Sequence, residues 1–193
     1  MRLFIGIEPS PLMRDALDAA SRTVRDNDPK WLEDKWVPAA NLHLTVKFLG
    51  DMPADTAEFL LEDLGTAVAD LAPFELELVR AVHPVPDRTR ATMLWSTFAD
   101  VSGQGASLIS RVEDFTSVAY GVVPDSRGFN PHVTLVRARS PRTLHTADIA
   151  EEAARQILAG ETSMSVRAVT LFRSTLTRTR PVYESLGSVE LGG

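Results

Sequence analysis

The chain has 193 residues, with 26 acidic against 20 basic side chains, a net charge of −6 and no cysteine. This length fits one domain with a substantial core, and the lack of cysteine excludes disulfides, thiolate metal sites and cysteine nucleophiles. The negative charge argues against broad non-specific binding to nucleic acid, which requires many neutralised phosphates, but it allows a local basic pocket for one small anion.

The first residues offer no targeting signal. The apolar run from Leu3 to Ile7 is too short for a secretory signal, and no stretch approaches the roughly 20 apolar residues of a membrane span. No Pro/Gly/Ser-rich segment is long enough to act as a flexible linker. We therefore expect a cytoplasmic protein that forms one domain over residues 1–193, built of two lobes.

The predicted elements alternate between strands and helices. Pro9-Ser10-Pro11 ends a first strand and offers Ser10 as the N-cap of a helix that begins at Pro11. Elsewhere, period-two alternation predicts strands and helical periodicity predicts helices. In chain order these are a strand at 2–8, a helix at 11–25, a strand at 43–49, a helix at 54–71, strands at 74–82 and 91–98, a helix at 102–119, a strand at 132–138, a helix at 147–158, and strands at 164–176 and 182–191.

Two short segments nearly repeat each other: NLHLTV at 41–46 and NPHVTL at 130–135. The chain has only three asparagines and four histidines, and two of each lie in these segments. The copies are 89 residues apart, almost half the chain. This is the spacing expected if one fold contains two similar halves that each supply one His and one Thr.

Strand geometry assigns these side chains to one face. On a strand, His43 and Thr45 point the same way, as do His132 and Thr134. If the halves are related by a pseudo-twofold axis, the four polar groups converge across a cleft on one small ligand, and they suit a tetrahedral anion.

Two histidines that titrate near neutral pH can divide the acid and base work of phosphodiester cleavage. Two threonine hydroxyls can donate to the non-bridging phosphoryl oxygens. Neither role requires a metal or a cofactor. In the competing interpretation, each His is a satisfied polar residue at a strand start and each Thr reflects β-propensity, or duplication has preserved both motifs although one lobe has lost its task.

NLHLTVKFLG and FNPHVTLVRA resemble the paired His-x-Thr-x motifs of the two-histidine (2H) phosphoesterase superfamily. Within it, the chain is most similar to the RNA 2′,3′-cyclic phosphodiesterase family, also called 2′-5′ RNA ligases. The likeness covers nearly the whole length and includes RLFIGIE, the Leu94-Trp95 pair, VTLFRSTL and PVYESL. The chain departs from the family at 177–180, where Thr-Arg-Thr-Arg replaces a turn that often contains glycine.

The resemblance implies an α+β fold that is bilobal and pseudo-twofold, with two antiparallel β-sheets lining a central cleft and helices on the outside. It also implies hydrolysis of the 2′,3′-cyclic phosphate at RNA ends, or of small cyclic nucleotides, to a 2′-phosphate. His43 would then be the general acid and His132 the general base, with Thr45 and Thr134 holding the phosphate. The two motifs are too alike for the sequence to distinguish the acid from the base.

Residues beyond the motifs give further predictions. Lys47 shares strand parity with His43 and is expected to add positive charge to the cleft, whereas Phe48 is expected to face the core. Arg137 has the opposite parity from His132 and would turn inward only at a bulge or strand end. Phe129 is the preferred platform for stacking a base. Other candidates are Arg173, Arg178 and Arg180 for phosphate contacts and Trp95 and Tyr183 for stacking, while His83 and His145 are expected to be structural or surface residues.

Three other functions remain open at this point. Ligation of a 2′,3′-cyclic end to a 5′-hydroxyl would use the same site in reverse, and a sensor would bind an RNA end or nucleotide without turnover. A metallohydrolase is disfavoured, because no His-x-His or His-x-x-x-His cluster is present and the paired threonines would be unexplained. We expect a monomer, since the two halves already supply the symmetry.

Overall fold

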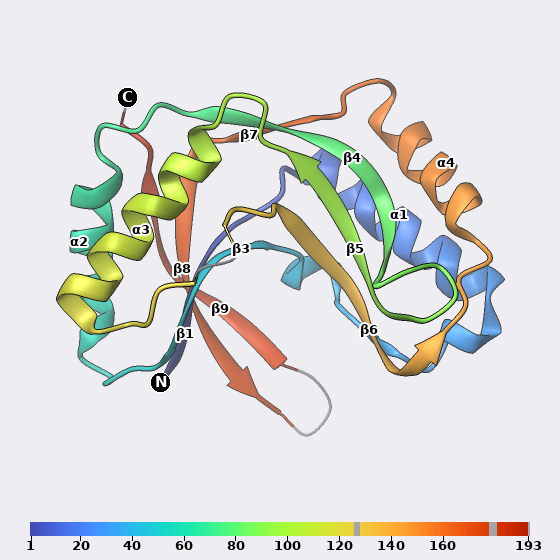
Figure 1. Cartoon of the computed structure of the whole chain (residues 1–193), viewed down its shortest axis with the longest axis horizontal. Helices are drawn as coiled ribbons and strands as arrows, with labels where there is room; N and C mark the ends of the chain where they lie inside the picture. Colours follow the sequence, from blue (N-terminus) through green and yellow to red (C-terminus); the bar gives the residue numbers. More distant parts are fainter. Residues whose placement is uncertain (126–127, 178–180, 193) are drawn as a thin grey trace.

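The computed structural model describes residues 1–125, 128–177 and 181–192. Within these ranges the chain forms four α-helices and a curled, fully antiparallel sheet of nine strands (Figure 1). The predicted α+β class is confirmed. The strands are β1 (Arg2–Ile7), β2 (Lys35–Trp36), β3 (Leu44–Asp51), β4 (Phe74–Val85), β5 (Ala91–Ala99), β6 (His132–Arg142), β7 (Ser163–Val166), β8 (Ala168–Leu176) and β9 (Pro181–Glu190), and the helices are α1 (Pro11–Asn27), α2 (Thr56–Val68), α3 (Gln104–Tyr120) and α4 (Ala147–Leu158).

The sheet consists of two halves. The strand order is β7-β4-β5-β6-β3-β1-β8-β9, and the short β2 pairs with β6. A single residue pair, Leu44 with Val133, connects β3 to β6 and so joins the halves. The two sheets expected from the family resemblance are therefore continuous through this one contact.

The strand predicted at 164–176 is two strands, one in each half. Val166 of β7 pairs with Phe74 of β4, whereas Leu171 of β8 pairs with Ile5 of β1. Only Arg167 lies between β7 and β8, although β7 is at one edge of the sheet and β8 is next to the other edge. The sheet must therefore curl strongly to bring these two strands together.

The helices cover the outside of the sheet, and two of them pack on the half opposite to the strand that precedes them. α1 and α4 pack against each other and against β4, and α2 and α3 pack against each other beside β9 and β3 (Figure 1). α1 follows β1 in the chain but packs on the half that contains β4, and α3 follows β5 but packs on the half that contains β3. The chain therefore crosses between the halves repeatedly. In the ranges described, no helix is long and apolar enough to cross a membrane.

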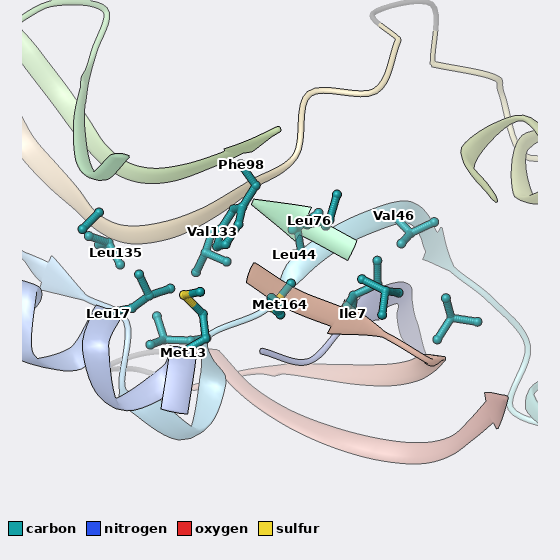
Figure 2. Packing of buried hydrophobic residues seen from close by; sticks show 14 of the residues in the cluster. Ile7, Met13, Leu17, Leu44, Val46, Leu76, Phe98, Val133, Leu135 and Met164 are labelled. Atoms are coloured by element: carbon teal, nitrogen blue, oxygen red, sulfur yellow. The ribbon is translucent and has the colours of Figure 1, made fainter. Parts of the chain in front are cut away.

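The predicted start of α1 is confirmed, since the Ser10 hydroxyl accepts a hydrogen bond from the Met13 amide at 3.2 Å. The helix turns Met13 and Leu17 into the core. Figure 2 shows these side chains close to Leu44 and Val133, the pair that joins the halves. One face of the two motif strands is thus apolar and buried.

Candidate active site

The polar residues of both motifs stand on the face opposite the core. Leu44 and Val133 are 1% and 0% exposed, and successive strand residues point to opposite sides. The histidine and threonine of each motif therefore share the other face, which we call the motif face. Since Leu44 lies opposite Val133 in an antiparallel pair, residue 43 lies beside residue 134 and residue 45 beside residue 132. Each histidine thus neighbours the threonine of the other motif.

Each histidine is held by the same bond. Nδ1 of His43 is 2.8 Å from the carbonyl oxygen of Asn41, and Nδ1 of His132 is 2.8 Å from that of Asn130. A carbonyl only accepts, so Nδ1 carries the proton and donates it. In the neutral tautomer that this bond selects, Nε2 is the basic nitrogen of each ring. The Asn41 side chain also donates to the Pro181 carbonyl at 3.2 Å, which ties this segment to β9.

Both motif strands carry a β-bulge at the same place. Between Thr45 and Lys47, β3 has one residue more than its partner β1, and β6 has an extra residue between Thr134 and Val136 relative to β5. A bulge reverses the alternation of side chains beyond it. The side chains after both threonines therefore depart from the parity predicted from the sequence.

The predicted position of Lys47 on the motif face is wrong. The bulge turns Lys47 to the core side, where it is 5% exposed. Its ammonium forms an ion pair with Glu113 of α3 and donates to the Val123 carbonyl at 2.8 Å. Lys47 therefore connects β3 to α3 and to the segment that leads to the second motif.

The bulges bring Phe48 and Arg137 to the motif face. Phe48, predicted to face the core, is 62% exposed, and its ring lies 6.0 Å from that of Phe4. Arg137 turns inward through a bulge, as the sequence allowed, and its Nη1 donates to the Met93 sulfur at 3.0 Å. The positive charge of Arg137 contributes to lowering the pKa of His43, which indicates that the two side chains are close.

His43 lies in an aromatic cluster. Its ring centroid is 4.7 Å from Phe4, 6.0 Å from Phe172 and 5.1 Å from Tyr183. Burial is the main cause that lowers the pKa of His43 below its usual value. The bond to Asn41 opposes this shift, and the charges of His132 and Arg137 add to it. In the free protein at neutral pH, His43 is therefore mainly neutral.

His132 has a different neighbour. Its ring stacks on Trp95 with a centroid distance of 3.9 Å and an interplanar angle of 24°. Trp95 lies opposite Thr134, and the equivalent partner of Thr45 is Gly6. The two halves thus place an indole and a glycine at matching positions.

Gly6 leaves the space that His43 occupies. A Cβ atom at this position would lie 3.0 Å from the Leu44 carbonyl oxygen, 3.3 Å from the Phe172 ring and 3.5 Å from Cδ2 of His43. Beside His43 is a cavity of about 130 Å³. Its lining consists of Glu8, Ala40, Asn41, Leu42, His43, Phe172, Tyr183 and Ser185.

The remaining candidates have other neighbours. Phe129 packs against Gly105 of α3, whose added Cβ would approach the Phe129 ring to 2.2 Å, so its predicted stacking role receives no support. Arg173 forms an ion pair with Glu184. Arg178 and Arg180 lie outside the described residues. His83 lies on β4 opposite Trp95, and His145 is exposed in the segment before α4.

Sequence reasoning missed Phe4, Gly6 and Phe172 as neighbours of His43. The only local signal was a glycine inside a strand, which often marks a close approach. In the ranges that the structure covers, no three or more His, Asp or Glu side chains are grouped in a way that could hold a metal ion.

Two halves that each bring one anchored histidine and one threonine to a shared face are the architecture of a two-histidine phosphoesterase. A family model described as the 2′-5′ RNA ligase superfamily matches residues 13–178, and the chain belongs to this family.

Its relatives include two curated proteins named RNA 2′,3′-cyclic phosphodiesterase. The chain is 27% identical to the Aquifex aeolicus protein over 194 residues, covering 100% of this chain and 98% of that one. It is 28% identical to the Geobacillus stearothermophilus protein over 183 residues, which is 95% of this chain but only 56% of that longer protein. A crystal structure from Thermus thermophilus superimposes with a TM-score of 0.75 at 27% identity and covers 100% of this chain and 99% of that one.

Proposed function

We propose that this chain hydrolyses the 2′,3′-cyclic phosphate at the 3′ end of RNA, or of a small nucleotide, to a 2′-phosphomonoester without a metal ion. The observation that carries the proposal is the matched pair of histidines anchored through Nδ1 on either side of the Leu44–Val133 pair. Several relatives bear the name RNA 2′,3′-cyclic phosphodiesterase, which supports the choice of substrate.

In this mechanism water attacks phosphorus and the bond from phosphorus to O3′ breaks. Nε2 of His132 takes a proton from the water, and Nε2 of His43 gives a proton to O3′ as it leaves. The hydroxyls of Thr45 and Thr134 donate to the non-bridging oxygens, and the Arg137 guanidinium balances their negative charge. The products are a 2′-phosphate and a 3′-hydroxyl.

The acid role of His43 requires that it carry a proton when substrate is bound. Its pKa is lowered in the free protein by burial and by the nearby charges of His132 and Arg137. A bound phosphate anion offsets these positive charges and favours the imidazolium. We therefore propose that substrate binding itself leads to protonation of His43, so that the general acid carries its proton only in the complex.

The test uses cytidine 2′,3′-cyclic phosphate in excess EDTA. The wild type is expected to release cytidine 2′-phosphate, identified by ³¹P NMR. His43→Ala and His132→Ala should each lose about 10²-fold or more of kcat, the usual contribution of a positioned acid or base. His145→Ala, an exposed histidine away from the motifs, is the matched control and should retain activity.

Each other result points to a different function. Activity that disappears on chelation would support metal catalysis, and tight binding without turnover would support a sensor. Ligation needs the same two proton transfers in reverse, so the assay repeated with a 5′-hydroxyl oligonucleotide measures it directly. The cytoplasmic location and the monomeric state stay predictions, the latter checked by light scattering.

A further inference from the structure

The motif face continues past His43 along β1 toward the start of that strand. Gly6, Phe4 and Arg2 follow at intervals of two residues, which places them on one side of the strand. Phe4 lies opposite Phe48 of β3, whose ring is 62% exposed. An exposed phenyl ring beside the proposed phosphate site provides a surface on which a base can stack.

Arg2 is the cation at the end of this row. In the described part of the chain its guanidinium forms no ion pair or hydrogen bond, although Asp51 stands opposite Arg2 on β3. The positive charges of Arg2 and Arg137 both act to lower the pKa of Tyr183 against the dominant effect of burial. The ring of Tyr183 also contacts the rings of His43 and Phe4, with centroid distances of 5.1 Å in both cases. Arg2 therefore belongs to the same electrostatic neighbourhood as the two motifs.

A second cavity, of about 350 Å³, lies at the N-terminal end of β1. The cavity forms because both strands that flank β1 extend as far as its first residue or farther. On one side β3 continues to Asp51, the partner of Arg2. On the other side β8 continues to Leu176, three residues past Arg173, which is the partner of Leu3. The lining residues are Met1, Arg2, Asp51, Arg173, Ser174, Thr175 and Leu176. The cavity adjoins the motif face, because Ser174 lies opposite Tyr183.

The charges around this cavity suit a nucleotide. The ion pair with Glu184 neutralises Arg173, so Arg2 remains as the cationic side chain of this lining that can contact a phosphodiester. The Asp51 carboxylate can accept from an amino group of a base. Arg2 is four residues along the strand from Gly6, about 13 Å, so a ligand that reaches it must extend beyond a single terminal nucleotide.

We propose that Phe48, Arg2 and this cavity form a subsite for the nucleotide that precedes the cyclic phosphate of an RNA strand. The inference rests on the proposed function and narrows its substrate class. The preceding base stacks on Phe48, and the phosphodiester that joins it to the terminal nucleotide contacts Arg2. The site therefore acts on oligonucleotide ends in preference to free cyclic mononucleotides.

The experiment compares cytidine 2′,3′-cyclic phosphate with the dinucleotide ApC that carries the same cyclic end. The wild type should have about a 10-fold higher kcat/KM for the dinucleotide. Arg2→Gln and Phe48→Ala should each remove most of this advantage, with a change below 2-fold for the mononucleotide. Phe59→Ala removes an equally exposed ring from α2, and Arg22→Gln removes an exposed cation from α1; neither control should alter the ratio.

Equal losses for both substrates, or a wild type without preference, would overturn the subsite. A second measurement keeps the test independent of turnover. The dissociation constants of the 2′-phosphorylated products of both substrates are measured by calorimetry for the same variants. If the wild type hydrolyses neither substrate but binds the dinucleotide product more tightly through Arg2 and Phe48, the hydrolase proposal fails and the subsite stands. If Arg2→Gln leaves the salt dependence of dinucleotide binding unchanged, the phosphate contact is refuted.

Discussion

The two motif strands are alike in their backbones and different in their surroundings. Both anchor a histidine through Nδ1 and both bulge directly after the threonine. His43 then lies among three aromatic rings, whereas His132 stacks on the single indole of Trp95. The backbone thus delivers two equivalent imidazoles, and the neighbouring side chains give them different electrostatics. Such a difference is what acid–base catalysis by two chemically identical groups requires.

The bulge positions themselves differ in chemistry. At equivalent places after the threonine, β3 has the charged Lys47 and β6 has Val136, and both side chains are buried. Lys47→Met removes one partner of a buried ion pair and leaves Glu113 uncompensated. We expect a loss of about 3 kcal/mol in the free energy of unfolding, measured by urea denaturation.

The double variant Lys47→Met/Glu113→Leu provides the control. It should recover much of this stability, because no isolated charge then remains buried. Equal stability of Lys47→Met and the wild type would show that the ion pair does not hold the β3 bulge against α3.

The second comparison is between Gly6 and Trp95, the partners of the two threonines. Gly6→Val forces side-chain atoms into space bounded by Leu44 and His43. We expect kcat/KM for cytidine 2′,3′-cyclic phosphate to fall about 10²-fold, since a displacement of about 1 Å of a catalytic group has effects of this size.

Gly65→Ala in α2 is the matched control. Its new Cβ would meet only Val189, at 3.5 Å, and alanine favours a helix over glycine by about 1 kcal/mol. The activity of Gly65→Ala should be unchanged. A similar loss of activity in Gly6→Val and Gly65→Ala would refute a specific role for the space at Gly6.

Trp95→Leu tests the other half of this comparison. Without the stacked indole, the ring of His132 keeps its bond to Asn130 but loses the flat surface at 3.9 Å. We expect about a 10-fold lower kcat, consistent with roughly 1 kcal/mol for an aromatic contact. Trp95→Phe should restore most of the activity. A purely structural effect on folding, followed by thermal unfolding, would affect Trp95→Phe and Trp95→Leu alike.

The smallest expected effect concerns protonation. The pKa of His43 in the folded protein lies below its usual value of 6.5, so protonation favours the unfolded chain. This contribution to stability is present above about pH 6.5 and is lost as the pH falls toward the folded pKa. Inorganic phosphate should raise the pKa of His43, so that the protein takes up protons when phosphate binds at neutral pH.

NMR titration of the histidine Cε1 protons with and without phosphate measures this change. Arg137→Gln should raise the pKa of His43 in the free protein, because it removes one of the charges that lower it. A pKa that does not respond to phosphate would contradict the proposed charging of His43 by the substrate.

The sequence predicted that buried and polar side chains alternate within the motifs, because this alternation is a local property of strands. Leu44 and Val133 are buried, and helices α1 and α4 begin at their predicted residues, Pro11 and Ala147. The repeat also indicated the fold family, and the match to residues 13–178 confirms it. These predictions needed only side-chain period, turn chemistry and the duplicated Asn-x-His-x-Thr pattern.

The positions of Lys47 and Phe48 could not be predicted in this way. A bulge arises from how two strands pair, and one extra residue exchanges the faces of the side chains that follow it. In β3 a second bulge between Phe48 and Gly50 restores the original faces. The split of the predicted strand 164–176 has a related cause, because Arg167 marks the point where the chain leaves one half of the sheet for the other.

The sequence by itself determined which groups make up the candidate site: two histidines, two threonines and an arginine close behind the second motif. Only the tertiary structure decided what surrounds them. Phe4, Phe172 and Tyr183 reach His43 from β1, β8 and β9, up to 140 residues away in the chain. Their effect on the pKa of His43 comes from packing in three dimensions, where burial and nearby charge set the cost of an imidazolium.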